Sequence, residues 1–342
     1  MAWSFHKQIK IIPGVHLNLR KSGLSTSIVV KEVINPVVTA GNIFSAAVHK
    51  ITSQNMQGVK ETIMLARQQR KELEDDLLSI QTTLRNSQLK RALSYLFLYG
   101  LIIKRIPKNL TADIAIQTEA IEQIRVAIMN CYVKLEIDFD SDIQEKYDAL
   151  VGAFKKLITS NKIWDVTSAH FQDRVIARSS ASTIVSKQEV RFSFSSIPDM
   201  RSNYEALYLK NANGADLYCY PGFIVMYSNE SDFAIIGIDE VNLHQSAVRF
   251  TETGTVPADS KIIDKTWAKV NKNGTPDKRF NGNYQIPIVR YGEIRFSTHT
   301  GLNEEYEFSN YEFSEEFSNK FKEYQIAIKR LKSFDMSSAG IF

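Results

Sequence analysis

The side chains best suited to chemistry are scattered along this chain rather than grouped. The histidines stand singly, and none lies at metal-ligand spacing from another histidine, a cysteine or a carboxylate: His6, His16, His49, His170, His244 and His299. Two pairs of adjacent acids occur, Asp239–Glu240 and Glu304–Glu305. An acid–base dyad needs carboxyl groups that face each other across a cleft, so we expect both pairs to face solvent. The sequence therefore predicts no catalytic residue, no metal site and no cofactor.

Two groups of cations are candidates for contact with an anion or an acidic partner. Arg174 and Arg178 lie among hydroxyl side chains in the segment 161–189, which we expect to be a polar connector. The second group surrounds one turn and contains Trp267, Lys269, Lys272, Lys278 and Arg279. In both cases the simpler interpretation, a solvated linker and an exposed turn, is favoured.

The composition is that of an ordinary globular protein with two or three domains. The chain has 342 residues, 44% of them hydrophobic, and its 42 cations nearly balance 38 anions. No block of positive charge stands out, so a nucleic acid or a membrane surface is not the favoured partner. Cys131 and Cys219 lie far apart, and the first ten residues lack the apolar core of a signal peptide. We therefore expect reduced thiols and a cytoplasmic protein.

The opening segment, residues 1–35, predicts a small β-sheet. Apolar side chains alternate on both sides of Pro13–Gly14, which is a typical turn pair. A second turn near Gly23 leads into a third strand at 25–30. A sheet of this size is rarely stable alone, so we expect it to pack on another domain or on another copy of the chain.

The middle of the chain, residues 52–160, predicts helices. Apolar side chains occur at Ile63, Leu73, Leu77, Ile80 and Leu84, and the last four of these recur at spacings of four, three and four. Thr111 is the expected cap of a second helix with Ile114, Ile121, Ile124 and Ile128, and the alternation at 133–139 favours an extended segment before a third helix. An intramolecular bundle or helical hairpin is favoured over an intermolecular coiled coil, because the seam is short.

The strongest apolar run is Tyr95–Ile103, between Lys90–Arg91 and Lys104–Arg105. A spanning helix needs about 20 apolar residues, and shorter runs are more often core helices. We expect burial, with shallow membrane contact as the alternative.

Residues 190–332 predict short strands followed by a helix, and residues 333–342 a tail. Asn310 is the expected cap of that helix, whose apolar face contains Phe313, Phe317, Phe321, Tyr324 and Ile328. This order resembles a pleckstrin-homology-like antiparallel β-barrel closed by an amphipathic helix, and an open antiparallel α+β sheet is the alternative. The fold class is therefore α+β.

The N-terminal segments Phe5–Ile11, Pro13–Leu19 and Lys21–Ser25 resemble the short N-terminal β domain of a bacterial family of unknown function. His6 and His16 stand where its members usually carry arginine or lysine. Six further segments are similar to parts of longer members: 163–168, 178–182, 213–218, 220–223, 266–272 and 301–306. The resemblance implies no activity.

These observations favour a non-catalytic interaction or assembly protein that acts through β edges and a helical bundle. Its expected partner is a protein or a second copy of the chain, and no small-molecule substrate is inferred. The first alternative is a module that binds an anion, a lipid head group or a nucleic acid. The second is an enzyme whose site has no recognisable pattern.

Overall fold

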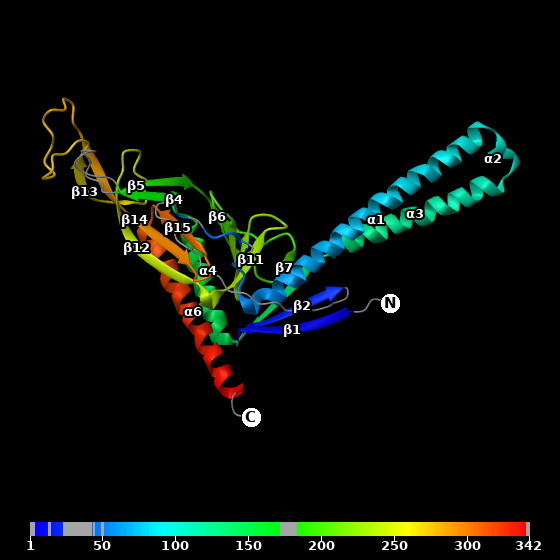
Figure 1. Cartoon of the computed structure of the whole chain (residues 1–342), viewed down its shortest axis with the longest axis horizontal. Coiled ribbons are helices and arrows are strands. Elements are labelled where there is room, and N and C mark those ends of the chain that lie inside the picture. The colour runs from blue at the N-terminus through cyan, green and yellow to red at the C-terminus, as the bar shows by residue number, and fades with distance from the viewer. Residues whose placement is uncertain are drawn as a thin grey trace.

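The computed structural model describes residues 4–12, 15–22, 43, 45–48, 51–171 and 183–339. Within these residues the protein is α+β, with mostly antiparallel sheets. A pair of long helices projects from a body that contains the sheets and the C-terminal helix (Figure 1).

Sheet A joins segments that lie far apart in the sequence. Its strands, in spatial order, are β1 (Ser4–Ile12), β2 (Val15–Ser22), β3 (Val133–Phe139) and β7 (Met200–Ser202). The first two form the expected antiparallel hairpin, β3 is antiparallel to β2, and β7 is parallel to β3. The N-terminal sheet therefore completes itself with strands from the same chain. The third strand predicted at 25–30 lies outside the described residues.

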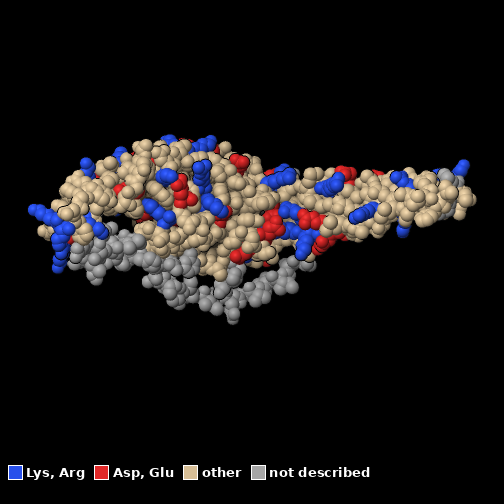
Figure 2. All heavy atoms as spheres, turned by 90° about the horizontal axis from the view of Figure 1, so that it is seen from above, with Lys and Arg blue, Asp and Glu red and all other residues tan. Residues whose placement is uncertain are grey.

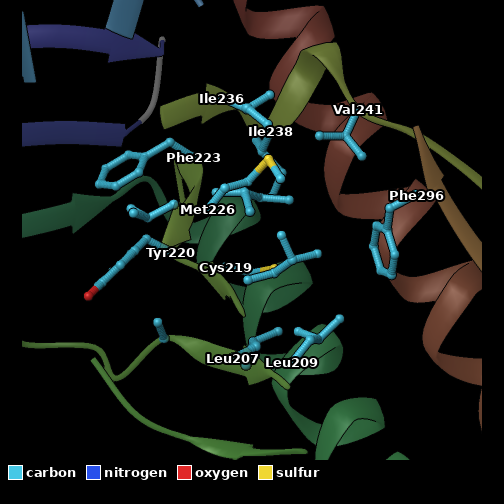
Figure 3. Packing of buried hydrophobic residues seen from close by; sticks show 14 of the residues in the cluster. Leu207, Leu209, Cys219, Tyr220, Phe223, Met226, Ile236, Ile238, Val241 and Phe296 are labelled. Atoms are coloured by element: carbon cyan, nitrogen blue, oxygen red, sulfur yellow. The ribbon is translucent and has the colours of Figure 1, made fainter. Parts of the chain in front are cut away.

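Sheet C is an antiparallel meander that forms the centre of the hydrophobic core. Its strands, in spatial order, are β11 (Phe233–Gly237), β10 (Phe223–Tyr227), β9 (Asp216–Cys219), β8 (Leu207–Leu209) and β6 (Phe192–Phe194). Side chains of this sheet gather beside α4 (Ser141–Leu157), as Figure 3 shows for Leu209 and Cys219, and α6 (Tyr311–Ala339) lies at the right of the same view. Every residue of β11 is buried, and Ser53 donates a backbone hydrogen bond to Ile235 at its edge.

Sheet B corrects the expected connector at 161–189. Its strands, in spatial order, are β12 (Asn242–Thr251), β14 (Gln285–Ser297), β15 (Asn303–Phe308), β4 (Ile163–Phe171) and β5 (Thr183–Glu189), and β13 (Lys261–Trp267) also pairs with β14. Lys187 on β5 forms an ion pair of 2.7 Å with buried Glu307, and its Nζ lies 3.9 Å from the ring centre of Trp164. These contacts of half-buried Lys187 join the polar segment to sheet B.

Helix α6 confirms the predicted C-terminal helix and contacts both larger sheets. The backbone N–H of Phe313 donates to Asn310 Oδ1 at 3.0 Å, which caps the helix, and the predicted apolar face is buried from Phe317 to Ile328. The helix packs against β14, and its Tyr324 hydroxyl donates to the carbonyl of Pro221 beside sheet C at 2.7 Å. No closed barrel is found among the described residues. The strands of residues 190–332 are divided among sheets A, B and C, and sheet B continues beyond β15 through β4 to the end strand β5.

The projecting pair, which we call the arm, is a helical hairpin. It contains α1 (Gln57–Leu96), α2 (Tyr99–Ile102) and α3 (Arg105–Met129), and the short helices η2 (Gln54–Met56) and η3 (Ile238–Glu240) belong to the body. α3 begins before the predicted cap: Pro107 lies in its first turn, where no N–H is needed, and Thr111 donates instead to the Pro107 carbonyl at 2.8 Å. The range 52–160 thus supplies the arm, strand β3 and helix α4.

Candidate functional site

The base of the arm is fixed to the body by two arginines on one turn of α1. Arg67 and Arg70 both reach Asp199, which is fully buried between them. Arg67 Nε lies 2.7 Å from Asp199 Oδ2, and Arg70 Nη1 lies 2.8 Å from Oδ1. Arg70 also donates to the carbonyl of Cys131, at the end of the segment that follows α3. The carboxylate therefore ties α1 to the loop before β7, and Arg70 joins α1 to the segment that follows α3.

The guanidinium of Arg67 also packs on the edge of sheet C. It lies 4.3 Å from the ring centre of Phe233 and 5.6 Å from that of Tyr227. A planar cation on an aromatic face adds attraction to the ion pair. The contacts of Arg67 and Arg70 with Asp199, together with the packing of Arg67 on Phe233, therefore fix the direction in which the arm leaves the body.

Beyond this base, α1 and α3 pack chiefly against each other. The predicted seam residues Leu73, Leu77, Ile80 and Leu84 are half-buried, and Ile121 on α3 is buried. Exposed neighbours such as Leu78 lie outside the seam. The intramolecular hairpin that the helical spacing favoured is thus present.

The far end of the arm corrects the expectation that Tyr95–Ile103 is buried. Leu96 is 72% exposed, Phe97 68%, Leu98 61% and Ile102 81%. We call this group, together with Tyr95 and Ile103, the apolar tip. These side chains cannot reach the core of the body. They lie at the far end of α1, which is about 60 Å long.

The turn that forms the apolar tip is tight. Leu98 adopts a positive φ of 62°, which is unusual for a residue with a side chain. Gly100 approaches the carbonyl oxygen of Ser94 so closely that a Cβ at this position would lie 2.8 Å from it. The chain reverses within a few residues, and the side chains of Leu98 and Ile102 are exposed.

At the opposite end of the molecule, the loop after β13 carries the cations that the sequence singled out. Figure 2 shows blue spheres gathered at this end. Arg279 is held by Asp277 through two contacts, Nε–Oδ1 at 2.9 Å and Nη2–Oδ2 at 2.7 Å. Lys272 and Lys278 are exposed and form no ion pair within the described residues.

The rest of that predicted group divides between an aromatic contact and the strand end. Lys269 is exposed near the ring of Phe280, at 5.9 Å, and Trp267 is half-buried where β13 ends. Arg174 and Arg178 lie outside the described residues. The loop therefore offers two unpaired lysines to an anion.

A buried acidic cluster was missed by the sequence reasoning, which placed Glu304 and Glu305 in solvent. Glu304 is 1% exposed and Asp165 is fully buried, on neighbouring strands of sheet B. Ser45 donates its hydroxyl to Glu304, and the backbone N–H of Ala212 donates to Asp165 at 2.7 Å. Burial, reinforced by nearby Asp165, raises the pKa of Glu304 to about 7 despite the Ser45 hydrogen bond. Strand alternation predicts that only one of two adjacent acids faces inward, whereas Glu305 is buried as well and pairs with Arg295 on β14.

A hollow of about 560 Å³ opens beside this cluster, lined by residues 188–191 and 210–212. Its lining includes Ala212, whose N–H holds Asp165, but the two carboxyl groups themselves are covered. They act through protein contacts, fastening residues 45 and 212 to sheet B. Within the described residues, no group of three or more histidine, cysteine or acidic side chains is arranged to hold a metal ion.

The comparisons with known proteins reach the N-terminal sheet. Residues 3–35 match the family model described as "Protein of unknown function (DUF4236)". This match is consistent with the resemblance of the first strands to a family of unknown function. No curated protein and no solved structure matches the chain. The similarity of later segments to longer members, and to pleckstrin-homology-like domains, stays a prediction.

Proposed function

We propose that this protein is a non-catalytic interaction or assembly protein that makes its contacts through the apolar tip and the edges of its sheets. The observation that carries the proposal is the exposure of the apolar tip at the end of a long arm. Clustered apolar side chains of this size are costly to leave in water, and such patches commonly mark contact sites.

The anchoring of the arm supports the same function. Asp199 and its two arginines fix the direction of α1 and α3 at the body, so the tip is presented at a set distance. A fixed presentation favours contact, because little orientational freedom is lost on binding.

The sheet edges offer a second kind of contact. β1 and β5 are end strands of their sheets within the described residues. An end strand can take an extended segment of another chain by main-chain hydrogen bonds. The partner proposed for these edges is a protein or a second copy of the chain, and the proposed location is the cytoplasm.

Site-specific cross-linking tests the proposal. A photoreactive residue at Phe97 should capture a partner in the native host, whereas the same residue at exposed Tyr284, at the opposite end of the molecule, should not. A matched pair of variants then tests whether this contact is needed for function in the native host. Phe97→Ser should abolish function, and Tyr284→Ser should not. Capture at neither position, with function retained in the Phe97 variant, contradicts the proposal.

The unpaired lysines after β13 favour a second candidate, an anion-binding function of that loop. Phosphate contacts weaken steeply as salt rises, whereas apolar contacts do not. Binding of a polyanion that falls with salt, and that Lys272→Gln with Lys278→Gln reduces, distinguishes this function from contact at the apolar tip.

A further inference from the structure

We propose that the end of the arm docks on an anionic membrane surface, with the apolar tip inserted shallowly among the lipids and a collar of cations on the head groups. The inference rests on the proposed contact function of the arm and names the partner of its tip.

The first support is the separation of charge along the arm. Residues 77–112 contain no aspartate or glutamate, but they contain six cations: Arg85, Lys90, Arg91, Lys104, Arg105 and Lys108. None of the six forms an ion pair within the described residues, and all except half-buried Arg91 are exposed. Acids return nearer the body, as at Asp75 and Glu119. On the face shown in Figure 2, the far end of the arm carries blue and tan spheres but no red ones.

The second support is the chemistry of the tip itself. Long aliphatic side chains and the ring of Phe97 lie at the outermost turn, while the cations lie within residues 85–91 before it and 104–108 after it. This order matches a lipid surface, in which acyl chains lie beneath anionic head groups. Within the described residues, no helix is long and apolar enough to cross a membrane. The tip would therefore enter one face of the bilayer only.

Charge also argues against two tips meeting head to head. Such a contact would bring two collars of six cations together, with no acid from residues 77–112 to offset them. Like charges across an interface oppose association. A second copy could bind the tip only by placing its own acidic residues, those around Asp75, against these cations. The test below treats that arrangement as a separate outcome.

The experiment uses the full chain and vesicle flotation. The probes are vesicles of phosphatidylcholine alone and vesicles with about one third phosphatidylserine. We expect flotation with the anionic vesicles, weak flotation with the neutral ones, and a decrease as salt rises.

Two tip variants and two matched controls locate the contact. Lys104→Gln with Arg105→Gln should lower the partition constant about thirtyfold, since each surface cation contributes about fivefold. Leu96→Ser with Phe97→Ser should lower it by about tenfold or more. The controls make equivalent changes on the body, at exposed side chains of the same kinds: Lys155→Gln with Lys329→Gln, and Ile262→Ser with Tyr284→Ser. They should leave the partition constant unchanged.

The outcomes separate this inference from the proposed function. Failure of the wild-type chain to float with anionic vesicles overturns the inference, as does flotation that the body controls reduce as much as the tip variants. If the tip variants instead dissociate an oligomer measured by light scattering without vesicles, the membrane inference fails and the contact function stands. If vesicle binding, oligomer size and cross-linking at Phe97 are all negative, both fail.

Discussion

Replacing Glu304 by glutamine should change how the stability of the protein depends on pH. Glu304 is almost fully buried, and its pKa is raised from 4.5 to about 7, first by burial and then by Asp165. A carboxyl group with a raised pKa holds its proton in the folded state at pH values where the unfolded chain has lost it. Its contribution to stability is therefore complete below about pH 4.5 and is lost as the pH rises through about 7.

The size of the effect follows from the shift. A difference of this size between folded and unfolded pKa corresponds to ~3 kcal/mol of unfolding free energy across the window. Glutamine resembles the protonated acid and can still accept from Ser45. The Glu304→Gln variant should thus match the wild type near pH 4.5 and exceed its stability by up to ~3 kcal/mol above pH 7.

Urea unfolding at a series of pH values measures this difference. Glu119→Gln, which removes an exposed carboxylate from α3, is the matched control. Its unfolding free energy should change with pH as that of the wild type does. Two results would refute the assignment of a buried carboxyl group that holds its proton. One is a Glu304→Gln variant whose unfolding free energy changes with pH as the wild type's does, and the other is a variant less stable than the wild type above pH 7.

Three further predictions concern the arm and the core. Asp199→Ala should cost ~3–5 kcal/mol of unfolding free energy, because two arginines at the base of the arm lose their buried partner; chemical denaturation measures it. Phe321→Ala should cost ~3–5 kcal/mol, whereas Ile326→Ala, on the exposed side of α6, should stay within ~0.5 kcal/mol. Leu77→Asp should reduce the helical circular dichroism of the arm, because the carboxylate enters the seam with α3, while Leu78→Asp at the exposed neighbouring position should not; equal effects from both variants would contradict the seam.

Local periodicity correctly predicted much of the secondary structure. The alternation at 133–139 became β3, and the helical spacing after Asn310 became α6 with the predicted side chains buried. Both signals depend on neighbours within a few residues, since side-chain direction repeats every two residues in a strand and every 3.6 in a helix. The turn-rich hairpin of β1 and β2 was predictable for the same reason.

The candidate sites depended on partners that are distant in the sequence. Glu304 is buried because Ser45 and β4 cover it, and Lys187 is half-buried because it lies beside Trp164 and Glu307. The spacing of residues along the sequence does not indicate contacts between residues that lie so far apart in it.

The apolar tip gives the converse case. Hydrophobicity identified Tyr95–Ile103 and the cations around it from the sequence alone, and predicted burial. Whether an apolar run is buried depends on what lies within reach of it in space. The ion pairs of Arg67 and Arg70 with Asp199 direct α1 away from the core, so only the tertiary structure determined that these side chains face outward.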